Sequence, residues 1–283
     1  MSAPLASPPT HRPTPAESRR VGIVGLGPIG RTLARELSQG IPGYRLSALS
    51  AKRLDRAREF SRSLPTPVPV LDADQIEACS DLVIECAPAA VFESIARPVI
   101  EAGKQLVVLS SGALLDNWHL VDRARQTGAV ISVPSGALLG LDAVQAAAQG
   151  TIAEVTMTTR KPVSSLLGAP HLRGREDELR ALTEPLQLFA GSARQAAVGF
   201  PANLNVAVAL ALAGVGPDRT MLNVWADPAL TRNTHHIAVR SDSADFQMTI
   251  ENIPSENPKT GRITALSVLA LLRKSTDALR IGT

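Results

Sequence analysis

Residues 20–30, RVGIVGLGPIG, decide the fold of this chain. Their first half is mostly apolar and predicts a short buried strand. Glycines then recur at Gly25, Gly27 and Gly30, and the residues from Arg31 to Gly40 are typical of a helix that ends at a glycine. A Gly-x-Gly-x-x-Gly loop between a strand and a helix predicts a site for a dinucleotide.

Each glycine of this loop has a physical role in such a site. Gly25 permits the tight turn, Gly27 leaves space for a pyrophosphate, and Gly30 lets the helix pack against the strand. The N-terminus of the helix offers free N–H groups and a positive dipole end to the phosphates. Ile29 belongs to the same loop, and we include it in the predicted cofactor site. An ordinary glycine-rich turn is the alternative.

The residues after the second predicted strand bear on the choice of cofactor. An acidic residue about 20 positions after the glycine loop usually holds the ribose 2′-hydroxyl of NAD. That position is Ser50, and Lys52 and Arg53 follow shortly after it. Cations here suit the 2′-phosphate of NADP through charge-assisted hydrogen bonds, although a solvated helix start explains them equally well. The predicted cofactor is therefore NAD or NADP.

Strands alternate with helices up to about residue 140. Beyond the first unit, strands are predicted at 44–51, 81–88, 105–112 and 129–136, and helices at 54–64, 90–103 and 114–128. This alternation indicates βαβ units and a parallel sheet. The sequence Ser-Gly-Ala-Leu-Leu occurs at 111–115 and at 135–139, and predicts turns at the carboxyl ends of two strands, where open α/β sheets bind ligands.

The pattern changes in the second half of the chain. Strands are predicted in succession at 151–161, 220–226, 235–241 and 244–252, with a helix at 201–214 and a final amphipathic helix at 261–278. We therefore predict an α/β chain: an N-terminal Rossmann-type parallel-sheet domain (20–140, joined by the C-terminal helix segment 261–283) and a C-terminal α+β substrate domain (141–260). Residues 1–19 contain five prolines and few apolar residues, and predict a disordered tail.

Composition excludes several function classes. The 283 residues have a formal net charge of only +3, and the cations are scattered, so nucleic-acid binding is not expected. No apolar run approaches the ~20 residues of a membrane span, and the N-terminus lacks the apolar core of a secretory signal. The two cysteines, Cys79 and Cys86, form no disulfide framework, which favours a reducing compartment. We therefore expect a cytoplasmic protein that meets neither membrane nor nucleic acid.

Several long segments give the chain a family resemblance. It resembles the L-aspartate dehydrogenases from Arg20 onward, in VPSGALLGLDA (133–143), TTRKP (158–162), LFAGSARQAA (188–197), FPANLNVAVALALAGVGPDRT (200–220), ADPALTRNTHHI (226–237) and SENPKTGRITALSVLALL (255–272). The resemblance implies a homodimer, with the C-terminal domain serving catalysis and dimerisation. It also implies oxidation of L-aspartate by NAD(P)⁺ to iminoaspartate, which yields oxaloacetate and ammonia or feeds NAD biosynthesis.

The resemblance also implies roles for three residues. His235, in Asn-Thr-His, corresponds to the active-site histidine, and Ala137 and Asn205 correspond to cofactor contacts. The residues themselves support these roles modestly, because a plain tight turn explains Ala137, helix capping explains Asn205, and a structural role explains His235. A histidine with an ordinary pKa near 6.5 can exchange protons at neutral pH, so His235 is predicted to be the general acid–base, while its neighbour His236 should face the other side of the strand.

Other candidates and functions remain open at this point. Arg160 and Lys161 are candidates for binding a substrate carboxylate, and Cys86 is expected to be a packed thiol rather than a nucleophile. The five histidines are too scattered for a metal site. The alternatives are another two-domain dehydrogenase, similar to homoserine dehydrogenase or dihydrodipicolinate reductase, and a non-catalytic NAD(P)-binding sensor.

Overall fold

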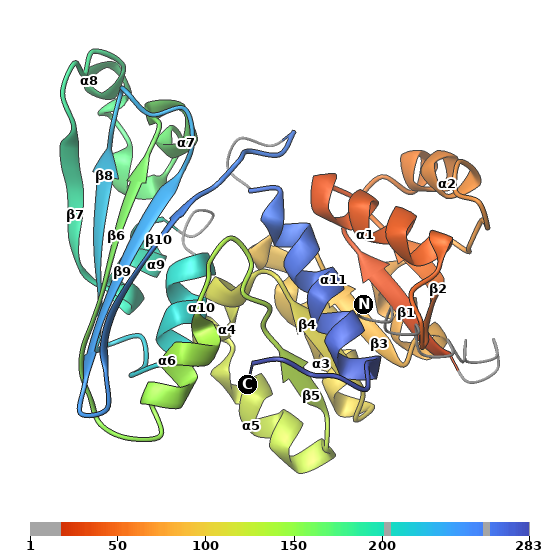
Figure 1. The fold of residues 1–283 in the computed structure, drawn as a ribbon. Coiled ribbons are helices and arrows are strands. Elements are labelled where there is room, and N and C mark those ends of the chain that lie inside the picture. Colours follow the sequence, from red (N-terminus) through yellow and green to blue (C-terminus); the bar gives the residue numbers. More distant parts are fainter. Residues whose placement is uncertain (1–17, 201–204, 257–260, 283) are drawn as a thin grey trace, which may run out of the picture.

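The computed structural model describes residues 18–200, 205–256 and 261–282 (Figure 1). The expected tail lies outside these residues except for its last two positions, and so do residues 201–204 of the predicted helix 201–214. None of the described helices is long and apolar enough to cross a membrane.

The first sheet is parallel throughout and has the strand order β2-β1-β3-β4-β5. Its strands are β1 (Arg19–Val24), β2 (Tyr44–Ser50), β3 (Leu82–Glu85), β4 (Gln105–Val108) and β5 (Val130–Ser132). The strand order reverses between β1 and β3, because the chain leaves β1 toward β2 on one side and then crosses to β3 on the other. Ligands of open α/β sheets bind at such a reversal, beyond the carboxyl ends of the strands.

Helices connect these strands, as the alternating pattern predicts. They are α1 (Pro28–Gln39), α2 (Leu54–Arg62), α3 (Phe92–Glu101), α4 (Ser111–Asp116) and α5 (Trp118–Thr127), with single 3₁₀ turns at Ala73–Gln75, Glu77–Cys79 and Ala89–Val91. Buried Val, Ile and Leu side chains of the strands pack against the apolar sides of these helices. The fold class predicted for the N-terminal part is confirmed.

Two local predictions in this part are wrong. The single helix expected at 114–128 is two helices, because Asn117 leaves the helical conformation and its Nδ2 donates to the Ala113 carbonyl at 2.8 Å. The turn expected at 111–115 is the short helix α4, whereas the second copy of the same five residues is a turn in which Leu138 N donates to Ser135 O. An amide that bonds to the preceding turn competes with helix continuation, and this accounts for the break.

The second sheet is mixed, with the order β10-β9-β6-β8-β7. Its strands are β6 (Ile152–Lys161), β7 (Leu186–Ser192), β8 (Thr220–Ala226), β9 (Thr234–Ser241) and β10 (Asp245–Glu251). The pair β6 and β8 is parallel, and the other neighbours are antiparallel. This arrangement confirms the α+β character expected of the C-terminal part.

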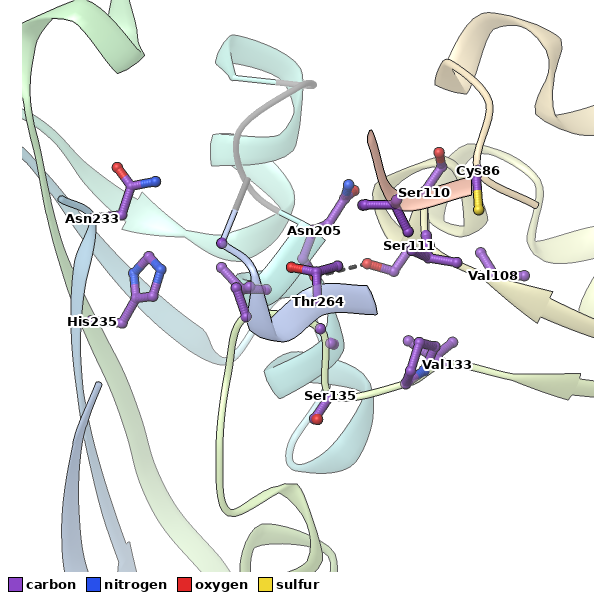
Figure 2. Close-up of a pocket in the computed structure, with 18 of the residues that line it drawn as sticks. Cys86, Val108, Ser110, Ser111, Val133, Ser135, Asn205, Asn233, His235 and Thr264 are labelled. Carbon is purple, nitrogen blue, oxygen red and sulfur yellow. Dashed lines mark hydrogen bonds between the residues drawn. The ribbon is translucent and has the colours of Figure 1, made fainter. Parts of the chain in front are cut away.

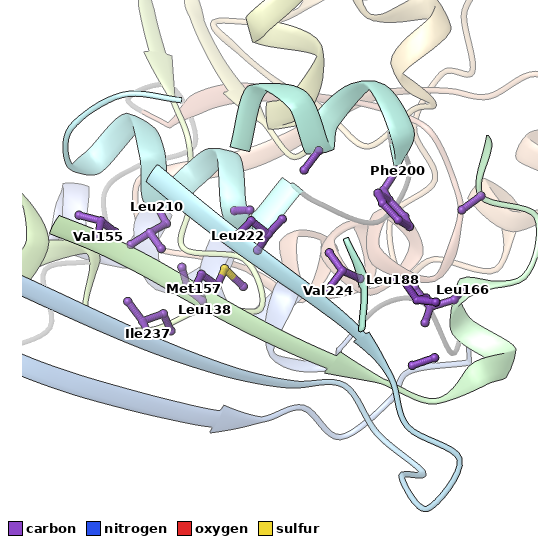
Figure 3. Close-up of a cluster of buried hydrophobic side chains, with 14 of the residues drawn as sticks. Leu138, Val155, Met157, Leu166, Leu188, Phe200, Leu210, Leu222, Val224 and Ile237 are labelled. Carbon is purple, nitrogen blue, oxygen red and sulfur yellow. The ribbon is translucent and has the colours of Figure 1, made fainter. Parts of the chain in front are cut away.

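One face of the second sheet is covered by helices. The C-terminal part contains the helices α6 (Leu141–Ala147), α7 (Val163–Leu166), α8 (Glu176–Arg180), α9 (Ala193–Gly199) and α10 (Asn205–Ala213), with a 3₁₀ turn at Pro170–Leu172. Figure 1 shows α6, α9 and α10 between the two sheets, and their apolar side chains form a core with the strands (Figure 3). Sequence patterns did not predict β7, α6 or α9, although Ser192 and Gln195 form a capping box at the start of α9.

The last helix returns to the first sheet. Helix α11 (Ile263–Thr276) lies beside α1 in Figure 1, and its Val268 and Leu272 belong to the same buried cluster as Leu33 and Val21. Tyr44 Oη and Ser275 Oγ, which are 2.6 Å apart, add a polar contact at its far end. The chain therefore crosses twice between the two sheets.

Candidate active site

The glycine loop sits where the strand order reverses. Gly25 has φ +100°, and a Cβ there would lie 2.4 Å from the carbonyl oxygen of Cys86, at the end of β3. A Cβ on Gly30 would lie 1.9 Å from the carbonyl oxygen of Gly25, so both positions require glycine. A Cβ on Gly27 would meet no atom within 4 Å, which leaves open space in front of the N-terminus of α1. This open cradle at a helix N-terminus fits the pyrophosphate of a dinucleotide.

A pocket lies between the carboxyl ends of the first sheet and the inner face of the second (Figure 2). The predicted residues Ile29, Ala137, Asn205 and His235 all line it, whereas the three loop glycines are outside its lining. The other described residues of its wall are Cys86, Ala87, Val108, Leu109, Ser110, Ser111, Val133, Pro134, Ser135, Gly136, Lys161, Val206, Ala209, Asn233, Gly261 and Thr264. The structure thus brings residues more than 200 positions apart in the sequence into one wall.

Ala137 lies in a turn that two other segments of the chain hold in place. Its carbonyl oxygen accepts a hydrogen bond from Asn252 Nδ2 at 3.0 Å, and the neighbouring Gly136 N donates to Ser267 Oγ of α11 at 3.1 Å. Gly136 has φ +63°, a conformation that glycine adopts without strain. The turn therefore presents backbone and a small side chain to the pocket in a fixed position.

Asn205 joins the two halves of the chain. It is the first residue of α10, and its Oδ1 accepts a hydrogen bond from Gly112 N of α4 at 3.1 Å. Its carbonyl oxygen accepts from Ser111 Oγ at 2.7 Å. The side-chain oxygen thus bonds to a helix of the first half, rather than capping its own helix as the simpler alternative supposed.

Glu85 is a functional candidate that sequence patterns missed. It ends β3, is fully buried, and accepts hydrogen bonds from Ala87 N at 2.7 Å, Ser110 N at 3.0 Å and Ser110 Oγ at 3.0 Å. Burial raises the pKa of this carboxyl above its ordinary value, and the hydrogen bonds oppose the rise. Glu85 therefore fixes the two strand ends that contribute Ala87 and Ser110 to the pocket wall. The signal that could have revealed Glu85 is an acidic residue directly after the apolar residues 82–84 of a predicted buried strand.

His235 faces the pocket from β9. Its side chain is buried, and Nδ1 lies 2.9 Å from Oγ1 of Thr159 on the adjacent strand β6. Burial, and to a smaller extent the charge of nearby Lys161, lower the pKa of His235 to about 3. The imidazole is therefore neutral at physiological pH. His236 has the opposite orientation, with Nδ1 3.0 Å from Thr249 Oγ1 on the outer side of the sheet.

The two neighbouring cations of β6 also point to opposite sides. Lys161 is buried and lines the pocket. Arg160 does not, because its guanidinium lies 5.0 Å from the ring centroid of Trp225 and 3.5 Å from a carboxylate oxygen of Asp227. Of the two proposed carboxylate-binding residues, the structure places only Lys161 at the pocket.

Cys86 lines the pocket, and burial raises the pKa of its thiol well above the ordinary value, so the thiol stays protonated and is a poor nucleophile. Within residues 18–200, 205–256 and 261–282, no three His, Cys, Asp or Glu side chains are grouped in a way that could hold a metal ion.

A second hollow lies on the other side of the glycine loop, at the end of β2. Lys52 and Arg53 line it together with Arg31 and Arg56, two cations that sequence reasoning did not include. The Arg31 guanidinium lies 5.6 Å from the ring centroid of Phe60, which also lines this hollow. Four positively charged side chains around one hollow beside a dinucleotide loop suit a phosphate group.

Two family models match successive parts of the chain. Residues 25–134 match the family model described as Homoserine dehydrogenase, NAD binding domain, and residues 142–275 match the one described as Aspartate dehydrogenase, C-terminal. L-aspartate dehydrogenase 3 of Bordetella bronchiseptica is 55% identical over 268 residues, which cover 94% of this chain and 98% of the relative.

Two further relatives extend the likeness. The L-aspartate dehydrogenase of Bradyrhizobium diazoefficiens is 54% identical over 270 residues, 95% of this chain and 96% of the relative. The crystal structure of aspartate dehydrogenase from Thermotoga maritima superposes with a TM-score of 0.73 at 25% sequence identity, and the match covers 93% of this chain and 99% of that one.

Proposed function

The chain belongs to the L-aspartate dehydrogenase family, and from this membership and its pocket we propose that it oxidises L-aspartate with NAD(P)⁺. The products are NAD(P)H and iminoaspartate, which hydrolyses to oxaloacetate and ammonia. The observation that carries the proposal is the position of His235, which lines one pocket with Ile29 of the glycine loop and with Ala137 and Asn205.

The glycine loop and the pocket divide the work of holding the cofactor. Gly25, Gly27 and Gly30 form the cradle for the pyrophosphate, and Ile29, Ala137 and Asn205 surround the nicotinamide end. When bound, the nicotinamide supplies the hydride acceptor for the hydrogen on the substrate Cα. The protein contributes by keeping the two reacting carbons close and aligned.

His235 acts as the general acid–base. An Nδ1–H donated to Thr159 Oγ1 leaves Nε2 unprotonated and able to accept a proton. Burial keeps this imidazole neutral, so Nε2 is available to take a proton from the substrate ammonium before hydride leaves Cα, or from the water that attacks the imine. Its pKa of about 3 in the empty pocket is far below the neutral range of an efficient base, so the proposed role requires that bound substrate raises this pKa.

We also propose that NADP is accepted at least as well as NAD. The support is the hollow at the end of β2, where Lys52 and Arg53 are joined by Arg31 and Arg56. These cations can bond to the 2′-phosphate that distinguishes NADP, and the acid that would favour NAD is absent, since Ser50 takes its place and is buried.

One assay tests the activity against the alternatives. NAD(P)H oxidation is followed with ammonia and oxaloacetate, then with ammonia and other keto acids, and the reverse reaction with L-aspartate, L-homoserine and L-alanine. Preference for the four-carbon dicarboxylates supports the proposal. Turnover of homoserine would favour the homoserine dehydrogenase alternative, whose family model matches only the cofactor half here. Cofactor binding without any turnover would favour the sensor. The homodimer, the cytoplasmic location and the link to NAD biosynthesis stay predictions.

A further inference from the structure

Four polar side chains form a compact block on the inner face of the second sheet. In the antiparallel pairing of β6 with β9, Thr159 lies opposite His235, and Arg160 lies opposite Thr234. Lys161 and Asn233 each lie one position beyond this last pair, and both line the pocket. Side chains two residues apart share a face of a strand. Thr159 and Lys161 therefore point inward together from β6, and Asn233 and His235 point inward together from β9 and the residue before it.

This block interrupts an otherwise apolar surface. The inner face of the same two strands continues with Val155, Met157, Ile237 and Val239, all fully buried in the core. The four polar residues are almost as deeply buried, with exposures of 0% for Thr159, 3% for Lys161, 7% for Asn233 and 2% for His235. Burying polar side chains costs free energy unless partners compensate it, and three of the four, Lys161, Asn233 and His235, line the pocket, where a ligand can contact them.

Two observations identify the chemistry of that ligand. Lys161 and His235 are the basic side chains among the described residues that line the pocket, and burial keeps the His235 imidazole neutral, so Lys161 is the formally cationic group of this wall. The buried Oδ1 of Asn233 has no hydrogen-bond partner, although its side chain lines the pocket beside His235 (Figure 2). A half-turn of the amide exchanges its oxygen and nitrogen without changing its shape, so this unpaired acceptor can face the pocket.

We propose that Lys161 and Asn233 form the substrate-recognition subsite, in which Lys161 binds a carboxylate of the substrate and Asn233 accepts a hydrogen bond from its ammonium group. This inference rests on the proposed function and deepens it, because it names the residues that select an acidic amino acid. A carboxylate is the complementary charge and acceptor for the Lys161 ammonium, and a donor satisfies the amide oxygen of Asn233. Both groups lie beside His235, which places the amine next to the base that deprotonates it.

The first test removes the charge of Lys161. Lys161→Met keeps the length of the side chain and loses the ammonium, so KM for L-aspartate should rise about 10- to 150-fold while the Kd for NADP changes less than about twofold. Arg160→Met is the matched control, because it removes a neighbouring cation that faces the outer side of the sheet beside Trp225. Its KM should stay close to that of the wild type.

The second test separates the two recognition residues. Succinate has the two carboxylates of aspartate but no amine. Binding of succinate and of L-aspartate is measured by calorimetry on the NADPH-loaded protein, in which no hydride acceptor is present and neither compound is oxidised. Lys161→Met should weaken binding of succinate and of L-aspartate alike. Asn233→Leu should weaken only L-aspartate, about 10- to 150-fold, because succinate has no ammonium to donate. Circular dichroism and the melting temperature verify that each variant is folded.

The outcomes distinguish this inference from the proposed activity. If the wild type oxidises L-aspartate and the Lys161 and Arg160 variants have equal KM values, the subsite assignment is wrong and the activity stands. If the wild type binds succinate through Lys161 but does not oxidise L-aspartate, the anion site is supported and the activity is refuted. A wild type that binds neither compound overturns both. If Asn233→Leu weakens succinate binding as much as it weakens L-aspartate binding, the assigned role of the amide is wrong.

Discussion

The adjacent histidines of β9 provide the sharpest prediction. His235→Ala and His236→Ala remove the same side chain from neighbouring positions of one strand, on opposite faces of the sheet. His235 is 2% exposed at the pocket, whereas His236 pairs with Thr249 away from it. If proton transfer depends on position in the pocket, only the first substitution should impair catalysis.

The expected magnitudes differ by orders of magnitude. A positioned general acid–base contributes 10²–10⁴-fold to the rate, equivalent to roughly 3–5 kcal/mol of barrier. His235→Ala should therefore lower kcat by about that factor and leave NADP affinity nearly unchanged. It also leaves the fully buried Thr159 hydroxyl without its partner, at a cost of about 1–3 kcal/mol in stability. His236→Ala should lower kcat by less than about tenfold.

A third variant separates chemistry from stability. His235→Asn retains a polar group near Thr159 but has no basic nitrogen, so it should recover part of the melting temperature and none of the rate. Steady-state kinetics with saturating L-aspartate and NADP, together with urea unfolding, measure both quantities. Small and equal rate losses in the His235 and His236 variants would show that neither ring transfers protons. Recovery of kcat in His235→Asn would make His235 a structural residue.

Three further predictions concern the cofactor site and pH. Gly27→Val should leave the fold intact, because a Cβ there meets no protein atom, but should weaken NAD(P) binding strongly in a fluorescence titration; unchanged affinity would remove the loop from the site. Lys52→Ala or Arg53→Ala should weaken NADP about 10- to 150-fold and spare NAD; if neither separates the cofactors in Kd measurements, the 2′-phosphate binds elsewhere. Because burial lowers the pKa of His235 to about 3 while the unfolded chain protonates near 6.5, its contribution to stability is complete above about pH 6.5 and is lost as the pH falls toward 3. In urea titrations, the free energy of unfolding should fall by about 2 kcal/mol more in the wild type than in His235→Leu when the pH is lowered from above 6.5 to 5. An equal fall in the two proteins would contradict the burial of a neutral imidazole.

Local sequence patterns predicted the part of the site that one segment builds. The loop from Gly25 to Gly30 is defined by a strand, a turn and a helix that follow each other directly, and the structure has all three where they were expected. The alternation of strands and helices likewise gave the parallel sheet. Both signals are local, and tertiary contacts reinforce them rather than compete with them. Asn117 shows the opposite case, since one side-chain hydrogen bond splits a helix that periodicity favours.

The missed residues depend on contacts between distant segments. Glu85 owes its role to Ser110, 25 residues away and just beyond the next strand. Arg31 and Arg56 join Lys52 only because two helices and a strand end converge at one hollow. No local periodicity carries this information. The resemblance supplied His235, Ala137 and Asn205, whereas the substrate-recognition subsite could be found only from the strand register.

The register of β6 against β9 decides which residue of each neighbouring pair works in the pocket. Lys161 and His235 face inward, while Arg160 and His236, next to them in the chain, face outward. A slip of one residue in either strand would turn its side chains to the opposite face, placing Arg160 or His236 in the pocket and Met157 or Ile237 in solvent. The apolar inner face of both strands opposes such a slip, because it would expose buried core residues. The same hydrophobic alternation that folds the sheet therefore also selects Lys161 and His235 for chemistry.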